Sequence, residues 1–312
     1  MAEELKLVKP WMVAVWPGMG QVAISAGYYL MSKLGMHALA EFSPRELFDV
    51  DHVEVKEGLI TTGRLPRSRL FLWKDPQGKR DIVVFIGEAQ PPLGKYTFCH
   101  KLIELAQQLG VERIVTFAAM ATQMHPEHAA RVFAAATNED ALAELKRLDL
   151  EVLKDGHVGG LNGIVLGVAA EAGMCGICLL GEMPHIFAQL PFPQASFSVL
   201  RVFTKMAGIE IELAELSEQA QEVGQKLGEI LASVERSMGH EQDEGPEFGT
   251  AYGSEQPEEP RLAAADVERL DGLFRQAKAD RAKAYELKNE LDRLGVFKDY
   301  EDRFLDLFKK QD

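Results

Sequence analysis

Hydrophobic and polar positions follow two rhythms along residues 11–238. Short runs rich in β-branched and aromatic side chains alternate with longer segments whose apolar side chains recur every three or four positions. The first rhythm predicts strands, at residues 11–16, 37–42, 69–73, 81–86, 113–118, 131–136 and 175–180. The second predicts helices, at residues 21–34, 98–109, 139–148, 163–172, 194–206 and 215–237. This alternation predicts an α/β domain with a mostly parallel sheet.

The pattern changes after residue 238. Residues 239–260 carry seven Asp or Glu, no Lys or Arg, and scattered Gly and Pro, which predicts a flexible acidic linker. From Val267 to Leu294 the apolar positions form a helical stripe, which Gly295 interrupts. Aromatic residues mark a second, shorter helix: Phe297, Tyr300, Phe304 and Phe308. We therefore expect a domain at 1–238, a linker at 239–260 and amphipathic helices at 261–312. The apolar stripe of these helices must pack against something, which could be each other, the domain, another subunit or a foreign partner.

The chain is acidic, with a net charge of -14 over 312 residues and a pI near 5.1. Such a charge repels phosphate backbones and anionic lipids, and no basic patch offsets it, so we expect neither nucleic-acid nor membrane binding. No run reaches the roughly 18 apolar residues of a membrane helix, and the N-terminus is acidic where a signal peptide is basic. We expect a cytoplasmic protein. Three cysteines do not form a disulfide framework.

A glycine-rich turn follows the first predicted strand, at Pro17-Gly18-Met19-Gly20. Its backbone N–H groups precede a helix, an arrangement that can hold an anion. Gly18-x-Gly20-x-x-Ala23 also fits the loose dinucleotide fingerprint, with Glu41 in the region expected for the ribose-binding acid. The alternative is that the glycines serve only a tight turn or a protein contact.

A second candidate loop follows the buried strand at 81–86. Glu88, Gln90 and Lys95 occupy the carboxyl end of a strand, where open α/β sheets bind ligands, and His100 lies one turn into the next helix. A carboxylate and an amine could act as acid and base, but no partner constellation is identifiable. The alternative is a loop that shapes a pocket or an interface.

A third loop repeats the Gly-Glu arrangement, at Gly181-Glu182-Met183-Pro184-His185. If the strands before Glu88 and Glu182 are neighbours, the two carboxylates form a pair at one sheet edge, as retaining glycosidases require. The alternative is that Gly-Glu only ends each strand and begins a turn.

Cysteine and histidine spacings predict no metal site. Cys175 and Cys178 form a CxxC, but they open an apolar strand on which positions i and i+3 face opposite ways, so we expect buried, unreactive thiols. His125 and His128 lie in a loop, where we expect exposure to solvent. We predict no cofactor either.

Several motifs together resemble the proteasome assembly chaperone two family, over about three quarters of the chain, roughly residues 10–238. They occur in the family's order: Trp16-Pro-Gly-Met-Gly20, Phe48-Asp49-Val50, Val55 with Gly58-Leu59-Ile60, Gly87-Glu-Ala-Gln-Pro-Pro92 with Tyr96 and Phe98-Cys99-His100, Gly159-Gly-Leu-Asn162-Gly163, Gly181-Glu182 and Ala195 through Leu200. The resemblance implies a three-layer α/β/α sandwich resembling the phosphorylase/hydrolase-like fold. It also implies homo- or hetero-oligomers and chaperoning of proteasome α-ring assembly without a catalytic step, and it adds Asn162 to the candidate ligand or interface residues.

Two features of this chain differ from what names and relatives in that family suggest. Some prokaryotic members carry names that suggest ATP-grasp ligases, but no nucleotide-binding lysine loop or metal-binding carboxylate cluster is recognisable here. Chaperones of the family often end in a hydrophobic-Tyr-any residue motif, whereas this sequence reads Phe308-Lys-Lys-Gln-Asp312.

We therefore expect a non-catalytic, oligomeric protein-binding or assembly-chaperone-like protein, with a proteasome α-type subunit as the partner that the resemblance implies. The alternative is a small-molecule or nucleotide-binding enzyme or sensor that uses the loops around Gly18, Gly20 and Glu88.

Overall fold

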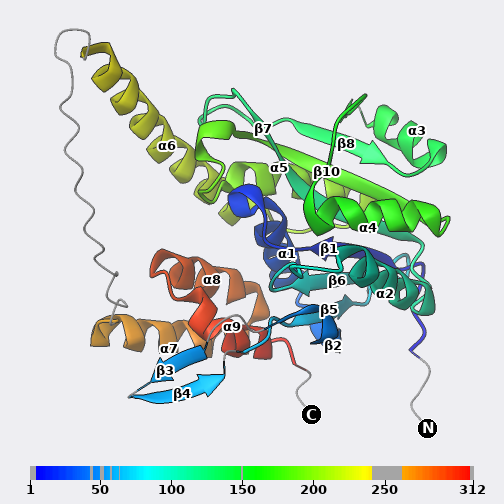
Figure 1. Ribbon diagram of the computed structural model, residues 1–312, viewed down its shortest axis with the longest axis horizontal. Coiled ribbons are helices and arrows are strands. Elements are labelled where there is room, and N and C mark those ends of the chain that lie inside the picture. The colour runs from blue at the N-terminus through cyan, green and yellow to red at the C-terminus, as the bar shows by residue number, and fades with distance from the viewer. Residues whose placement is uncertain are drawn as a thin grey trace.

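The computed structural model describes residues 5–42, 45–49, 53–56, 58–62, 64–148, 150–240 and 262–309 (Figure 1). Its strands are β1 (Trp11–Val15), β2 (His37–Phe42), β3 (Val53–Lys56), β4 (Leu59–Thr62), β5 (Ser68–Trp73), β6 (Ile82–Gly87), β7 (Arg113–Thr122), β8 (Val132–Ala136), β9 (Glu151–Val152) and β10 (Cys175–Pro184). Its α-helices are α1 (Val22–Lys33), α2 (Lys95–Gln108), α3 (Glu139–Arg147), α4 (Gly160–Glu171), α5 (Pro193–Ala207), α6 (Ala214–His240), α7 (Ala264–Ala279), α8 (Ala284–Arg293) and α9 (Phe297–Asp306). All seven predicted strands and all six helices predicted before residue 238 are confirmed.

Eight strands form one sheet in the order β2-β5-β6-β1-β7-β10-β8-β9. The four central strands, β6, β1, β7 and β10, run parallel. On the flanks, β5 is antiparallel to β6, β2 to β5 and β8 to β10. The prediction of a mostly parallel sheet is therefore correct for the central strands only. Hydrophobic periodicity predicts where a strand lies in the sequence, but not in which direction it runs beside its neighbour.

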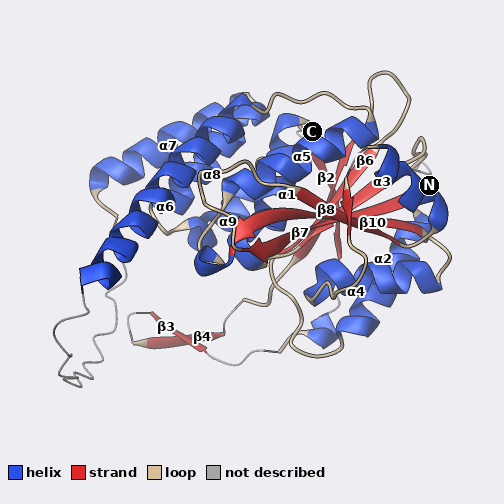
Figure 2. Ribbon diagram, turned by 90° about the horizontal axis from the view of Figure 1, so that it is seen from above, coloured by secondary structure: helices blue, strands red, loops and turns tan. Residues whose placement is uncertain are grey.

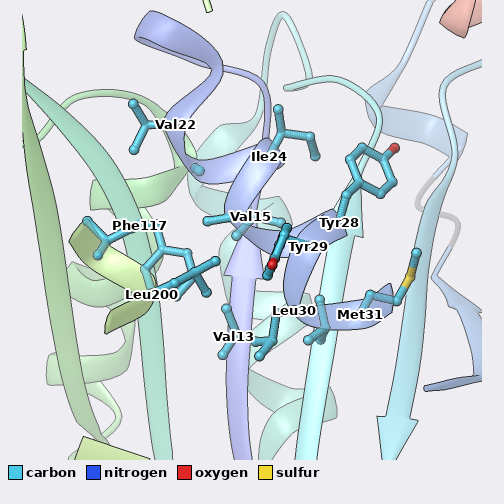
Figure 3. Packing of buried hydrophobic residues seen from close by; sticks show 14 of the residues in the cluster. Val13, Val15, Val22, Ile24, Tyr28, Tyr29, Leu30, Met31, Phe117 and Leu200 are labelled. Atoms are coloured by element: carbon cyan, nitrogen blue, oxygen red, sulfur yellow. The ribbon is translucent and has the colours of Figure 1, made fainter. Parts of the chain in front are cut away.

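Both faces of this sheet are covered, which makes three layers. In β1, Val13 and Val15 join one buried cluster while Met12 and Ala14 join the other, because successive side chains on a strand point to opposite faces. Figure 2 shows α1 and α5 on one side of the sheet and α2 and α4 on the other. In Figure 3, Val13 and Val15 point toward Leu30 and Tyr29 of α1. The three-layer α/β/α sandwich is confirmed.

The C-terminal helices α7, α8 and α9 pack on this sandwich, so the chain itself covers their apolar stripe. Tyr28 of α1 meets Phe297 and Phe304 edge to face, with ring centroids 5.3 and 5.6 Å apart. The hydroxyl of Ser32 donates to the carbonyl of Arg281 at 2.8 Å. At the edge strand β2, the Ala38 N–H donates to the carbonyl of Phe308 at 2.6 Å. Apolar side chains of all three helices belong to the same buried cluster as α1.

Two features differ from the prediction. The stripe from Val267 to Leu294 is two helices, α7 and α8, because Asp280 is extended (φ -138°, ψ 104°) and its carboxylate accepts a bond from the Ala282 N–H at 3.0 Å. Ala277 and Ala284 lie seven residues apart, so the apolar repeat continues across this break. The β3–β4 hairpin, a separate two-stranded sheet, was not predicted.

Candidate functional site

The turn after β1 is held by backbone hydrogen bonds to the segment between β10 and α5. Gly20 has φ 60°, and a Cβ there would lie 2.6 Å from Sδ of Met183. Its N–H donates to the carbonyl of Ala188 at 2.8 Å, and its carbonyl accepts from the Phe192 N–H at 3.0 Å. The turn thus holds the segment between β10 and α5, and its N–H at Gly20 is not available to an anion.

The interpretation of this turn as a dinucleotide site is wrong, because the strand that carries Glu41 is not next to β1. Glu41 lies at the end of β2, an edge strand separated from β1 by β5 and β6. In a dinucleotide-binding fold the ribose-binding acid ends the strand next to the first one. Here the Glu41 carboxylate pairs with the guanidinium of Arg67 instead.

Gln90 joins three segments at the carboxyl ends of the central strands. Its Nε2 donates to the carbonyl of Pro17 at 3.1 Å, and its Oε1 accepts from the N–H of Leu161, in the first turn of α4, at 3.1 Å. Gly160 has φ 66°, and a Cβ there would lie 2.9 Å from Gln90 Oε1. Residues that were predicted in separate loops, Pro17, Gln90 and the glycine-rich start of α4, therefore meet.

A cavity of about 340 Å³ lies beside this junction. Four of the predicted candidate residues line it, namely Gly18, Met19, Gln90 and Asn162. Asn162 is 6% exposed, and its Oδ1 has no hydrogen-bond partner. The cavity therefore combines an unpartnered polar group with the start of α4.

Glu88 is buried in an ionic cluster. Its Oε2 accepts from Arg64 Nη2 and from the Arg67 N–H, each at 2.9 Å, and Arg69 Nη1 lies 3.7 Å from Oε1. Burial raises the pKa of the Glu88 carboxyl, and the charge of Glu301 acts in the same direction, against the Arg67 N–H, Arg64 and Arg69. Glu88 therefore anchors the segment before β5.

Helices α8 and α9 complete the surroundings of Glu88, which the sequence did not predict. Asp302 bonds to Arg64 Nη1 at 2.7 Å and to Arg67 Nη1 at 3.0 Å. A second cavity, of about 300 Å³, is lined by Glu88, Lys288 and Glu301 among others. Burial lowers the pKa of the Lys288 ammonium, against the opposing effect of its ion pair with Asp292.

Glu182 has its own arginine. Arg131 donates to both carboxylate oxygens, at 2.6 and 2.9 Å, and the hydroxyl of Thr122 donates at 2.8 Å. The Arg131 hydrogen bond keeps the pKa of the Glu182 carboxyl below its ordinary value. Because β1 and β7 separate β6 from β10, Glu88 and Glu182 are not a pair, and the paired-carboxylate hypothesis is wrong.

The remaining predicted loop residues do not line either cavity. Lys95 begins α2. His100 is exposed, packs on the ring of Tyr96 and lies 3.9 Å from a carboxylate oxygen of Glu171 on α4. His185 Nδ1 lies 3.0 Å from the carbonyl of Thr122, where the paired strands β7 and β10 both end. The two histidines link neighbouring elements, and none of the three side chains contacts another of them.

The prediction of buried thiols is confirmed for Cys178 and wrong for Cys175, which is only half-buried because it lies at the first position of β10. Cys178 and Cys99 are buried, which raises their pKa values to about 11 and about 12. Cys175 packs against one buried cluster and Cys178 belongs to the other, so the CxxC faces opposite ways. Within the ranges that the structure describes, no group of three or more His, Cys, Asp or Glu could hold a metal ion. No described helix is both long and apolar enough to cross a membrane.

The fold defines a three-layer α/β/α protein with a mixed sheet whose central strands are parallel. A family model described as the PAC2 family matches residues 12–231, and the chain belongs to this family. The uncharacterized protein MJ1210 of Methanocaldococcus jannaschii is 28% identical over 51% of this chain, and the match spans 61% of that relative's length.

Solved structures share this fold, among them two from Pyrococcus furiosus. The structure described as Pyrococcus furiosus PbaB, an archaeal proteasome activator, is 28% identical, with a TM-score of 0.61 over 75% of this chain and 96% of that one. Pyrococcus furiosus PbaA, described as an archaeal homolog of proteasome-assembly chaperone, is 23% identical, with a TM-score of 0.56 over 75% of this chain and 96% of the other.

Proposed function

We propose that this protein is a non-catalytic, oligomeric protein-binding protein that acts like an assembly chaperone in a proteasome-related process. Membership in the PAC2 family carries the proposal. The similarity to PbaB, whose description is a proteasome activator, supports a proteasome-related partner, and the family resemblance makes a proteasome α-type subunit our choice of partner. Helix α6 continues through residue 238 to His240, and the rest of the predicted acidic linker, residues 241–260, lies outside the described residues. The domain boundaries at 238 and 260 therefore remain part of the proposal.

The chemistry of the strand-end residues supports binding without turnover. Glu88 and Glu182 are each held by arginines. The Thr122 hydroxyl, which donates to Glu182 at 2.8 Å, also accepts from the Met124 N–H at 3.1 Å, so this contact fixes the loop after β7. The buried Cys99 and Cys178 thiols hold their protons firmly because burial raises their pKa values. The polar groups therefore stabilise loops, which is what a binding surface requires.

The β3–β4 hairpin supplies a contact surface for a partner. Val55 and Ile60 are opposite each other in the register and 65% and 72% exposed, and Val53, two residues from Val55 on the same face, is 51% exposed. Figure 2 shows the hairpin standing apart from the large sheet. An isolated two-stranded hairpin is marginally stable in water, and an exposed apolar face of this kind marks an interaction site.

The test is binding of the full-length protein to purified proteasome α-type subunits from the same host, measured by biolayer interferometry. We expect the double variant Val55→Lys, Ile60→Lys to bind at least about tenfold more weakly, because it places two charges on the buried contact. Val234→Lys, on the exposed face of α6 at 47% exposure, is the matched control and keeps wild-type affinity. No binding by the wild-type protein would overturn the function, and equal binding by the double variant would overturn the hairpin's role.

A second candidate function is a small-molecule or nucleotide-binding sensor or enzyme. The cavity beside Gly18 and Asn162 favours ligand binding there. The surroundings of Gly20 and Glu88 do not, since the N–H of Gly20 is bonded and Glu88 is held by arginines.

A further inference from the structure

The surface between α5 and α6 holds a third cavity, which the protein-binding proposal does not use. It has a volume of about 340 Å³ and is bounded on a third side by the loop between β7 and β8. It shares no lining residue with the two cavities described above. The side chains that line it include three glutamines, two serines, one arginine and one glutamate. Both the volume and the lining therefore suit a small polar molecule.

The two charged residues of this cavity, Arg201 and Glu127, have opposite signs. Within the described part of the chain, neither of them forms an ion pair. The guanidinium carbon of Arg201 lies 5.7 Å from the ring centroid of Phe197, one turn earlier on α5, and that ring also lines the cavity. A guanidinium is thus held at the α5 wall without a carboxylate to bind.

Glu127 is positioned by two glycines of α6. A Cβ at Gly228 would overlap Oε1 of Glu127, and a Cβ at Gly224, one turn earlier, would lie 3.0 Å from the carbonyl oxygen of Pro126. The loop between β7 and β8 can therefore lie directly against α6 at these positions. This packing places the Glu127 carboxylate beside the cavity, where it has no cation to bind.

Ser198 adds a buried polar group to the same wall as Arg201. It is 2% exposed, and its hydroxyl has no hydrogen-bond partner among the described residues. The unpartnered atoms that are sealed from solvent, such as the Thr116 hydroxyl, do not include Ser198 Oγ, so a ligand in the cavity can reach it. Because residues three apart lie on one face of a helix, Ser198 and Arg201 can bind the same ligand group.

We propose that this cavity binds a small zwitterion with a carboxylate and an ammonium group, either a free α-amino acid or a dipeptide. Its carboxylate accepts from the Arg201 guanidinium and the Ser198 hydroxyl, and its ammonium group donates to the Glu127 carboxylate. The amides of Gln221 and Gln225 offer donors and acceptors to a polar side chain of the ligand. The site is independent of the β3–β4 hairpin and of the proposed function.

The experiment is isothermal titration of the full-length protein with L-glutamine, at neutral pH and constant ionic strength. Two analogues each lack one charge: glutaramate has no ammonium group and 4-aminobutanamide has no carboxylate. We expect L-glutamine to bind at least about tenfold more tightly than either analogue, because each loses a charged hydrogen bond.

The variants remove the same contacts from the protein. Arg201→Gln and Glu127→Gln should each weaken L-glutamine binding at least about tenfold, and neither should melt at a lower temperature because both side chains are exposed and unpaired. Ser198→Ala should weaken binding at least about fivefold. Gly228→Ala should also weaken binding, since its Cβ displaces the Glu127 carboxylate, although alanine favours a helix.

Arg236→Gln and Glu235→Gln are the matched controls, because both residues are exposed on α6 and neither lines this cavity. These variants should bind L-glutamine with unchanged affinity. L-alanyl-L-glutamine distinguishes the sources, since a dipeptide site binds it more tightly than L-glutamine and an amino-acid site binds it more weakly. Absence of binding by both compounds, equal binding of an analogue, or undiminished binding by Arg201→Gln or Glu127→Gln would each overturn the proposal.

Discussion

Two glycines of one turn, Gly18 and Gly20, provide the sharpest test of how the strand-end region is built. Gly20 has φ 60°, and a Cβ there would lie 2.6 Å from Sδ and 2.8 Å from Cε of Met183. Gly18 has φ -166° and ψ -170°, which any residue adopts, and its Cβ would meet only Asn162 Nδ2, at 3.7 Å. The same substitution by alanine therefore has opposite structural consequences at positions two residues apart.

The magnitudes follow from these contacts. For Gly20→Ala, the left-handed conformation costs about 1–2 kcal/mol and crowding of Met183 about 1–3 kcal/mol. Alanine also reduces the conformational entropy of the unfolded chain, which offsets about 0.4–1 kcal/mol of this destabilisation. We expect Gly20→Ala to lower the free energy of unfolding by about 1–5 kcal/mol, and Gly18→Ala to leave it unchanged or raise it by up to about 1 kcal/mol.

Urea unfolding followed by tryptophan fluorescence measures both variants, with comparison of the denaturant slopes to show that the unfolded state is unchanged. If Gly18→Ala proves as destabilising as Gly20→Ala, the geometry assigned to this turn is wrong. If neither variant is destabilised, the packing of Met183 against Gly20 is wrong.

Three further predictions concern the rest of the chain. Phe304 is fully buried on α9, so Phe304→Ala should lower the free energy of unfolding, measured in urea, by about 3–5 kcal/mol and speed the hydrogen exchange of amides in α8 and α9. Val267→Ala, at a position that is 38% exposed, should change neither quantity. Unchanged exchange in Phe304→Ala would contradict the docking of these helices. The Arg131 hydrogen bond holds the pKa of the Glu182 carboxyl below its ordinary value of 4.5, so the charged form stabilises the fold above that pH and the stabilisation is lost as the pH falls below it. The stability deficit of Glu182→Gln should therefore shrink as the pH is lowered through 4.5 and below, and a constant deficit would contradict the pairing with Arg131. Because burial raises the pKa values of Cys99 and Cys178, iodoacetamide at about pH 8 should modify them only after unfolding, as peptide mass spectrometry would show, and rapid modification of the native protein would contradict their burial.

The sequence predicted the elements of the α/β/α sandwich because strong local patterns mark them. The run at 82–86 is apolar throughout, as expected of β6, which is buried on both faces. Asn138 predicted the start of α3, and its side chain caps that helix. The hairpin was missed because Val55 and Ile60 are exposed, so burial does not impose a pattern on it.

The candidate site was harder to predict because strand order and long-range contacts decide it. Glu88 and Glu182 look equivalent in sequence, but two strands separate β6 from β10. Gln90 meets Leu161 across 71 residues, and Tyr28 meets Glu301 across 273. No local pattern encodes these contacts. Gly18, which the glycine-rich turn indicated, and Asn162, which the family resemblance added, do share a cavity.

The measurement that tests the central claim most directly is native mass spectrometry of the full-length protein, affinity-purified under mild conditions from its own host. The proposed function predicts an oligomer of this chain that retains a proteasome α-type subunit, and that loses it in the Val55→Lys, Ile60→Lys variant. A monomer, or an oligomer that retains no proteasome subunit, would contradict the claim that this PAC2-family protein acts as a proteasome-related assembly chaperone.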